Sequence, residues 1–486
     1  MRAGSKDPKK QLSRVWGAGE DPEVEGEGGL MLRDEARLST GQEAPAPASA
    51  AASASTSASG LGSGSASASA PGSAGANVSS IVEELPRGAD PGISLAADGK
   101  PEGKLEGKLE GKLEGKKARH PWLARPWVPA VVVYVQTRLG LLLISGAIAV
   151  VDHRSLATQL SAYDGGWYLK LAAHGYPDHV LHAQSTLGFF PLYPLAIRAL
   201  SLVVHSQLVA ALCIALAGGL VATVLVQRLA TAWWGETTGR RAAVVFALFP
   251  GSLVFSMVYS EGLTLPLMLG CLLALRSRRW VLAGILGGLA AVVEPVALVL
   301  PVVVALVALR DVWQRRSAAP LVAPVLSVLG IAAFAGFLWA WTGSPFAALI
   351  AQHDGWHNQT VPLGVLSLPL VHHLLGHPAD MLGYLGTWNL WNGVLGSAFF
   401  VWSLVRVWPI RHELSPGGFA WLVGVGAVTL WSVKTLPNAR MLLLAFPAVL
   451  VWARRSSQAR YRTFVGLELA TFVLMSTVTL SGHMLP

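Results

Sequence analysis

Long apolar runs follow one another from about residue 126 almost to the C-terminus, and this pattern limits the folds that the chain can adopt. A helix needs about 20 apolar residues to cross the hydrocarbon core of a membrane, and every backbone polar group must be satisfied there without water. Only 13% of the residues are charged, whereas about a quarter are charged in soluble domains. The sequence therefore predicts an all-α integral membrane protein that crosses the bilayer many times.

The basic residues between the apolar runs predict the topology, because Lys and Arg are enriched in cytoplasmic loops. Placing these junctions on one side gives a helical bundle of about eleven membrane segments, with the N-terminus cytoplasmic and the C-terminus outside. The predicted spans are 129–150, 207–226, 242–259, 261–275, 321–341, 383–405, 418–433, 441–453 and 464–480, with the paired arms of 280–309.

Segment 280–309 must enter and leave on the same side in this topology. Glu294 and Pro295 lie near its middle. Proline breaks a helix, and a carboxylate at the centre of a span is costly in lipid. We therefore expect a helical hairpin with Glu294 and Pro295 at its outer apex. Residues 187–204 and 361–376 fit only as re-entrant or surface-lying helices.

The N-terminal quarter of the chain has a different composition. Residues 44–76 are nearly all small or polar, and a Gly-Lys-Leu-Glu repeat occupies 103–114. Such sequences cannot bury enough apolar surface to offset the entropy lost on ordering. We expect a disordered cytoplasmic tail over 1–125 and one membrane domain over 126–486.

The overall charge and the cysteines exclude other classes of protein. The net charge is +9, but the basic residues lie mainly between apolar runs, so nucleic acid is not an expected partner. Cys213 and Cys271 lie inside apolar stretches, which argues against a disulfide framework. The sequence has no Asp-x-Asp motif and no metal ligands at the usual spacings. We expect neither a metal nor another cofactor.

Residues with reactive or sugar-binding chemistry collect in the segments predicted to lie outside. The first outer loop carries Asp164 ahead of two glycines, then Trp167 and Tyr168, and Tyr193 follows in a Phe-Phe-Pro-Leu-Tyr-Pro stretch. A carboxylate at the membrane surface suits a general base, and aromatic faces suit stacking on sugar rings. Taken alone, Asp164 fits a plain helix N-cap equally well.

Other outer segments add carboxylates, aromatic rings and cations. Cations on the outer side run against the usual charge distribution, and either a bound phosphate or contact with lipid headgroups would explain them. The candidates in these segments are Tyr259, Glu261, Trp356, His357, Lys434 and Arg440.

At these residues the chain resembles the PIG-V-like mannosyltransferases, which are polytopic glycosyltransferases of the GT-C class and include bacterial members. The resemblance covers about residues 127–455. Tyr163 and Glu294 depart from the family pattern, which usually has Trp and Arg at these positions. The matching motifs are 163–168, 175–176, 189–194, 259–261, 352–356 and Arg440 ahead of 445–447.

The resemblance implies a GT-C-like bundle that transfers mannose from a polyprenyl-phosphate carrier to a glycolipid or glycan acceptor. The reaction would be inverting and metal-independent, on the extracytoplasmic face of a plasma membrane. Asp164 would be the base, with Lys434, His357 and Arg440 as phosphate partners. The other substrate-binding residues would be Trp167, Tyr168, Tyr193, Tyr259, Glu261 and Trp356. The alternative is a polytopic transporter or flippase for a lipid-linked or small polar substrate.

Overall fold

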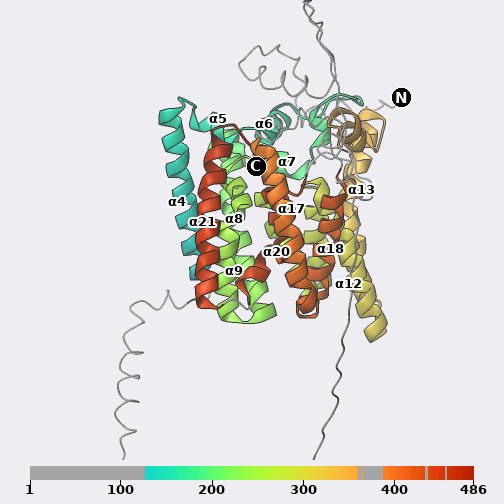
Figure 1. Ribbon diagram of the computed structural model, residues 1–486. Coiled ribbons are helices and arrows are strands. Elements are labelled where there is room, and N and C mark those ends of the chain that lie inside the picture. Colours follow the sequence, from blue (N-terminus) through green and yellow to red (C-terminus); the bar gives the residue numbers. More distant parts are fainter. Residues whose placement is uncertain (1–124, 126, 359–363, 365–386, 433–435, 455–456) are drawn as a thin grey trace, which may run out of the picture. The chain divides into compact units, whose positions relative to one another are not determined.

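The computed structural model describes residues 125, 127–358, 364, 387–432, 436–454 and 457–486 (Figure 1). Every regular element in these ranges is a helix, which confirms the predicted all-α class. The predicted tail lies outside the described residues apart from Arg125. Most of the predicted surface helix 361–376 also lies outside them.

Six helices in the described part of the chain are long and apolar enough to cross a membrane. Counting η3 and α10 as one span bent by 111° would give a seventh. The predicted count of about eleven is therefore not confirmed. The six are α4 (Val128–Val151), α8 (Gln207–Trp234), η4 with α12 (Pro295–Arg315), η5 with α13 (Ala319–Thr342), α17 with η8 (Trp388–Glu413) and α21 (Gln458–Leu480).

The count is lower partly because two predicted spans are not continuous helices. The first, 242–259, divides into α9 (Glu236–Leu248) and η3 (Pro250–Ser256). The second, 441–453, divides into short pieces. Each break lies at a proline, Pro250 in the first span and Pro447 in the second, and proline lacks the backbone donor that would continue a helix. These pieces are α19 (Ala439–Leu444), α20 (Phe446–Leu450) and η9 (Val451–Ala453).

The break predicted within 280–309 is confirmed. Helix α11 (Trp280–Ala290) ends before Glu294, whose backbone is extended, and Pro295 opens the turn η4 that leads into α12 (Val299–Arg315). Helix α11 lies very close to α13 (Val322–Thr342): a Cβ on Gly284 would meet the Ala323 carbonyl oxygen at 2.6 Å. Glycine is required for this backbone approach.

Arg138 holds the break between α9 and η3 from inside the bundle. It lies in α4 and is buried. Its guanidinium donates to the carbonyl oxygens of Ser252 at 2.6 Å and Ala247 at 3.3 Å, and to the Ser252 hydroxyl at 3.0 Å. This residue was not among the candidates predicted from the sequence. A charged side chain inside a span is costly unless it is bonded, and here it satisfies carbonyl groups that the broken helix leaves open.

Candidate active site

Asp164 is the first residue of helix α6 (Asp164–His174) rather than its N-cap, so the N-cap interpretation is wrong. The N-cap is Tyr163, whose φ of 59° and ψ of −122° are rare for a residue with a side chain. The Tyr163 hydroxyl donates to the Thr479 carbonyl in α21 at 3.4 Å. The carboxylate of Asp164 consequently lies at the positive end of the helix dipole.

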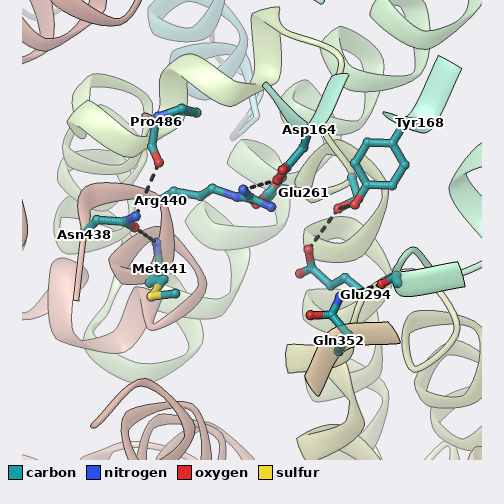
Figure 2. Close-up of polar contacts among 11 residues, drawn as sticks. Asp164, Tyr168, Glu261, Glu294, Gln352, Asn438, Arg440, Met441 and Pro486 are labelled. Atoms are coloured by element: carbon teal, nitrogen blue, oxygen red, sulfur yellow. Dashed lines mark hydrogen bonds and ion pairs between the residues drawn. The ribbon is translucent and has the colours of Figure 1, made fainter. Parts of the chain in front are cut away.

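Arg440 joins Asp164 to Glu261 (Figure 2). Its Nη1 donates to Asp164 Oδ2 at 2.6 Å, and its Nε donates to Glu261 Oε1. The guanidinium also lies over the ring of Tyr259, with Cζ 4.5 Å from the centroid. The side chain of Asp164 is 31% exposed, whereas that of Glu261 is fully buried. Of the two carboxylates, only Asp164 is open to a substrate.

The turn before α19 fixes the position of Arg440. The Asn438 side chain caps α19 by accepting from the Met441 backbone N–H at 3.0 Å. The Ala439 backbone N–H donates to Asn392 Oδ1 on α17 (Trp388–Val407) at 3.2 Å. Gly251 of η3 approaches the same turn so closely that a Cβ would meet the Ala439 carbonyl oxygen at 2.1 Å. Arg440 is thus held by backbone contacts on two sides.

A second polar network lies beside the first (Figure 2). The Tyr168 hydroxyl donates to Ser260 Oγ at 2.9 Å, and Ser260 Oγ donates to Glu294 Oε2 at 2.9 Å. Glu294 is buried, and its Oε1 has no hydrogen-bond partner among the described residues. The hairpin apex therefore contacts the first outer loop through Ser260, next to Glu261.

The aromatic residues predicted to bind substrate divide into two groups. Trp167 and Trp356 are partly exposed, and their rings meet edge to face with centroids 5.1 Å apart. Tyr168, Tyr193 and Tyr259 are buried. Tyr193 packs edge-on against Tyr168, with ring centroids 4.9 Å apart. Tyr193 therefore packs against α6 through the ring of Tyr168, and the predicted place of both rings in a sugar path stays a prediction.

The Gln-x-x-x-Trp motif connects two of the loops that were predicted to lie outside. Gln352 Nε2 donates to the Gly188 carbonyl at 2.6 Å, and Trp356 Nε1 donates to the Ser185 carbonyl at 3.3 Å. A Cβ on Gly188 would lie 2.7 Å from Trp356 Nε1, so only glycine fits there. His357 follows in an exposed position. Lys434, the other predicted phosphate partner, lies outside the described residues.

Sequence reasoning missed one exposed cation near the site. Lys170 lies on α6, and its Nζ is 5.9 Å from the centroid of the Trp167 ring. The signal was available, because a helix places residues three apart on neighbouring positions of one face. Among the described residues, no group of three or more His, Cys, Asp or Glu side chains is arranged to hold a metal ion.

Two solved structures of an oligosaccharyltransferase from Archaeoglobus fulgidus are similar to this chain. The apo form is 14% identical, with a TM-score of 0.43, and the match covers 74% of this chain and 57% of the other. The complex with Zn and sulfate is 16% identical, with a TM-score of 0.38, and coverage of 68% and 49%. The chain thus spans little more than half of that protein's length. No curated protein matches the sequence.

Residues 136–313 match the family model described as Mannosyltransferase (PIG-V). This match agrees with the predicted resemblance to the PIG-V-like mannosyltransferases over 178 of the 486 residues. The match is narrower than the predicted resemblance over 127–455. It includes Asp164, Glu261 and Glu294, whereas Arg440 lies beyond the segment that matches the PIG-V model.

Proposed function

We propose that this chain is a membrane glycosyltransferase of the GT-C type that moves mannose from a polyprenyl-phosphate carrier to a glycolipid or glycan acceptor. The extracytoplasmic face of a plasma membrane, with the N-terminus in the cytoplasm, is part of the proposal. One observation carries it: Asp164 is partly exposed and fixed by Arg440 beside a buried Glu261. The description of the PIG-V family names mannosyl transfer, which fits this arrangement.

In the proposed reaction, Asp164 accepts the proton of the acceptor hydroxyl group. The acceptor oxygen then forms a bond with the anomeric carbon of mannose as the bond from that carbon to the phosphate oxygen breaks. The bonding electrons leave with the phosphate. Phosphate is a good leaving group, so no general acid is required. Attack from the face opposite the phosphate inverts the anomeric configuration.

The main role of Arg440 in this scheme is to bind and position the two carboxylates. It bonds both Asp164 and Glu261, so its single positive charge is already shared between two negative groups. A guanidinium has five N–H donors, which leaves others for a phosphate oxygen. Neutralising the departing phosphate nevertheless calls for further positive charge. We assign that role to Lys434 and His357, as the sequence predicted, and add Lys170.

Transport is the competing function, and two observations favour it. The 111° bend between η3 and α10 and the fully buried Glu261 are typical of transporters with broken helices. Two others favour transfer: Glu261 is the first residue of its helix, and it shares Arg440 with a partly exposed Asp164.

The experiment compares Asp164→Asn with Asp152→Asn, which makes the same change at an exposed carboxylate of the same predicted outer segment, without contact to Arg440. Membranes holding each full-length variant receive labelled polyprenyl-phosphate mannose and a glycolipid acceptor fraction. We expect Asp164→Asn to lower product formation by about a hundredfold or more, and Asp152→Asn to retain it. Insertion and expression should match in both. Full transfer by Asp164→Asn would remove Asp164 from the mechanism; movement of the labelled lipid across proteoliposomes without any product would favour transport.

A further inference from the structure

A cavity lined by both apolar and charged side chains lies far from Asp164, at the other end of helix α10. Its volume is about 420 Å³, and α10, α11, α12 and α18 (Pro416–Trp431) contribute to its lining. Helix α10 (Glu261–Arg276) runs between the two regions, with Glu261 in the Arg440 cluster and Arg276 in the cavity wall. Sixteen helical residues rise about 24 Å at 1.5 Å per residue. The cavity and Asp164 therefore lie at opposite ends of a membrane-crossing helix. The predicted topology places the cavity at the cytoplasmic end.

The lining of this cavity carries an excess of positive charge. Arg276, Arg278 and Arg310 line it together with a single carboxylate, Asp311. Asp311 accepts from Arg278 Nε at 3.1 Å and also pairs with Arg315 at 3.5 Å, so its charge is already matched. Arg310 has no polar partner within the part of the chain that the structure describes. The excess positive charge favours an anion in this cavity.

Two further contacts organise the cavity. Arg276 Nη2 donates to the Ala232 carbonyl at the end of α8 at 2.8 Å, which fixes one guanidinium in the wall. Helix α18 begins at the cavity: Ser415 caps it by accepting from the Gly418 backbone N–H at 3.3 Å, and Pro416 follows in the lining. The positive end of the helix dipole adds to the attraction for an anion that the arginines create.

An apolar hollow adjoins the cavity and shares Trp280 with it. It is lined by Arg279, Trp280, Val281, Leu282 and Ile285 on α11, and its volume is also about 420 Å³. Val281 and Ile285 are 54% and 46% exposed. Tryptophan is enriched where the headgroups of a bilayer meet the acyl chains. A positively charged pocket is thus joined to an apolar surface along one helix.

We propose that this pocket binds the phosphate headgroup of an anionic phospholipid, with one acyl chain along Trp280 and Ile285. Basic pockets between membrane helices suit anionic lipids. The arginines form charge-assisted hydrogen bonds with the phosphate, and the apolar helix surface contacts the acyl chain. Inorganic phosphate carries the same anionic group as the lipid headgroup, but it has no acyl chain to contact Ile285. The site is separate from the proposed transfer reaction, which takes place at the other helix ends.

The test measures which lipids remain bound to the full-length protein in native mass spectrometry. The purified chain is mixed with equal amounts of phosphatidylglycerol and phosphatidylcholine that carry the same acyl chains. We expect phosphatidylglycerol to be retained preferentially. Arg276→Gln with Arg310→Gln should lower its retention at least about tenfold, the loss expected for charge-assisted hydrogen bonds. Arg240→Gln, which changes an exposed arginine paired with Glu236 outside the cavity, should leave retention unchanged.

Three results would overturn the proposal. The first is equal retention of phosphatidylglycerol by the double variant and by Arg240→Gln. The second is equal retention of the two lipids by the unaltered chain. The third is complete displacement of phosphatidylglycerol by millimolar inorganic phosphate, which would make the pocket a site for free anions. Mannosyl transfer by the double variant should stay unchanged, so failure of lipid binding and failure of the proposed enzyme activity remain distinct.

Discussion

Arg440 donates a hydrogen bond to Asp164 at 2.6 Å, across 276 positions of sequence. This bond joins the first outer loop, inside the segment that matches the family model, to a turn beyond that segment. Arg440 also bonds the buried Glu261, so one guanidinium fixes both carboxylates. The geometry of the proposed base therefore depends on a residue supplied by the last part of the chain.

Removing Arg440 should destabilise the protein as well as inactivate it. Arg440→Ala leaves the carboxylate of Glu261, which is 0% exposed, buried without its partner, and breaking such a pair costs about 3–5 kcal/mol. We expect a lower thermal unfolding temperature in detergent. Adding Glu261→Gln to Arg440→Ala should recover part of the loss, because a neutral side chain is less costly to bury. An unfolding temperature for Arg440→Ala equal to that of the unaltered chain would contradict the pairing.

Glu294 should act through the hydrogen bond that it accepts from Ser260. Glu294→Gln keeps an acceptor oxygen there and should change stability by less than about 1 kcal/mol. Glu294→Leu leaves the Ser260 hydroxyl unsatisfied and should cost about 1–3 kcal/mol, with reduced transfer because Tyr168 and α6 lose their support. Ser260→Ala removes the same bond from the other side, together with the bond that Ser260 accepts from Tyr168, so it should lower transfer at least as much as Glu294→Leu. Equal activity of the Gln and Leu variants would show that the bond does not position α6.

Arg138 should be essential for the break between α9 and η3. Arg138→Met removes bonds to two backbone carbonyls. The Ala247 carbonyl keeps the bond from the Ser252 hydroxyl at 2.8 Å, whereas the Ser252 carbonyl loses the Arg138 donor, at a cost of about 1–3 kcal/mol for an unsatisfied buried group. The matched control is Arg228→Met, on the exposed face of α8. Thermal unfolding of the two purified variants would compare them. We expect a large loss only for Arg138→Met; similar unfolding temperatures would show that the carbonyls find other donors.

Acidification should loosen the contact between two outer loops. Hydrogen bonds with His353 and His182 hold the pKa of Asp354 below its ordinary value. A carboxyl group with a lowered pKa in the folded state contributes stability above its ordinary pKa of about 3.9. That contribution is lost as the pH falls through the lowered value.

Hydrogen exchange of the segment around His182 would measure this contact. The exchange rate should rise in the acidic range for the unaltered chain, after correction for the intrinsic rate. In Asp354→Asn the corrected rate should already be raised at neutral pH. A corrected rate that is independent of pH in both proteins would show that the contact contributes nothing.

The sequence predicted which segments of the chain share one side of the bundle. Basic junctions placed the segments that carry Asp164, Glu261, Glu294 and Arg440 together, and the structure joins them by hydrogen bonds. The reason is physical. The charge at the junctions sets the direction in which each span crosses the membrane, so the loops on one side all lie at the same end of the bundle. Which side of a membrane these residues face stays a prediction.

Other features depended on packing that apolar composition does not encode. A run of apolar residues looks the same whether it spans the bilayer or divides, as 242–259 and 441–453 do, although Pro250 and Pro447 marked both breaks. In the sequence, Tyr193 is indistinguishable from an exposed aromatic residue of a loop, yet it is buried and packs edge-on against Tyr168. Arg440 was predicted to bind phosphate. The structure shows in addition that it donates hydrogen bonds to two carboxylates, which the sequence does not reveal.

The placement of Arg138 also has a consequence for biogenesis. Its main acceptor, the Ser252 carbonyl, lies 114 residues further along the chain. Protein synthesis proceeds from the N-terminus, so α4 leaves the ribosome long before those acceptors exist. Until they arrive, this cation must be shielded by water, by lipid headgroups or by the insertion machinery. Helix α4 can therefore reach its final packed position only after the segment that carries Ala247 and Ser252 has been synthesised and has packed beside it.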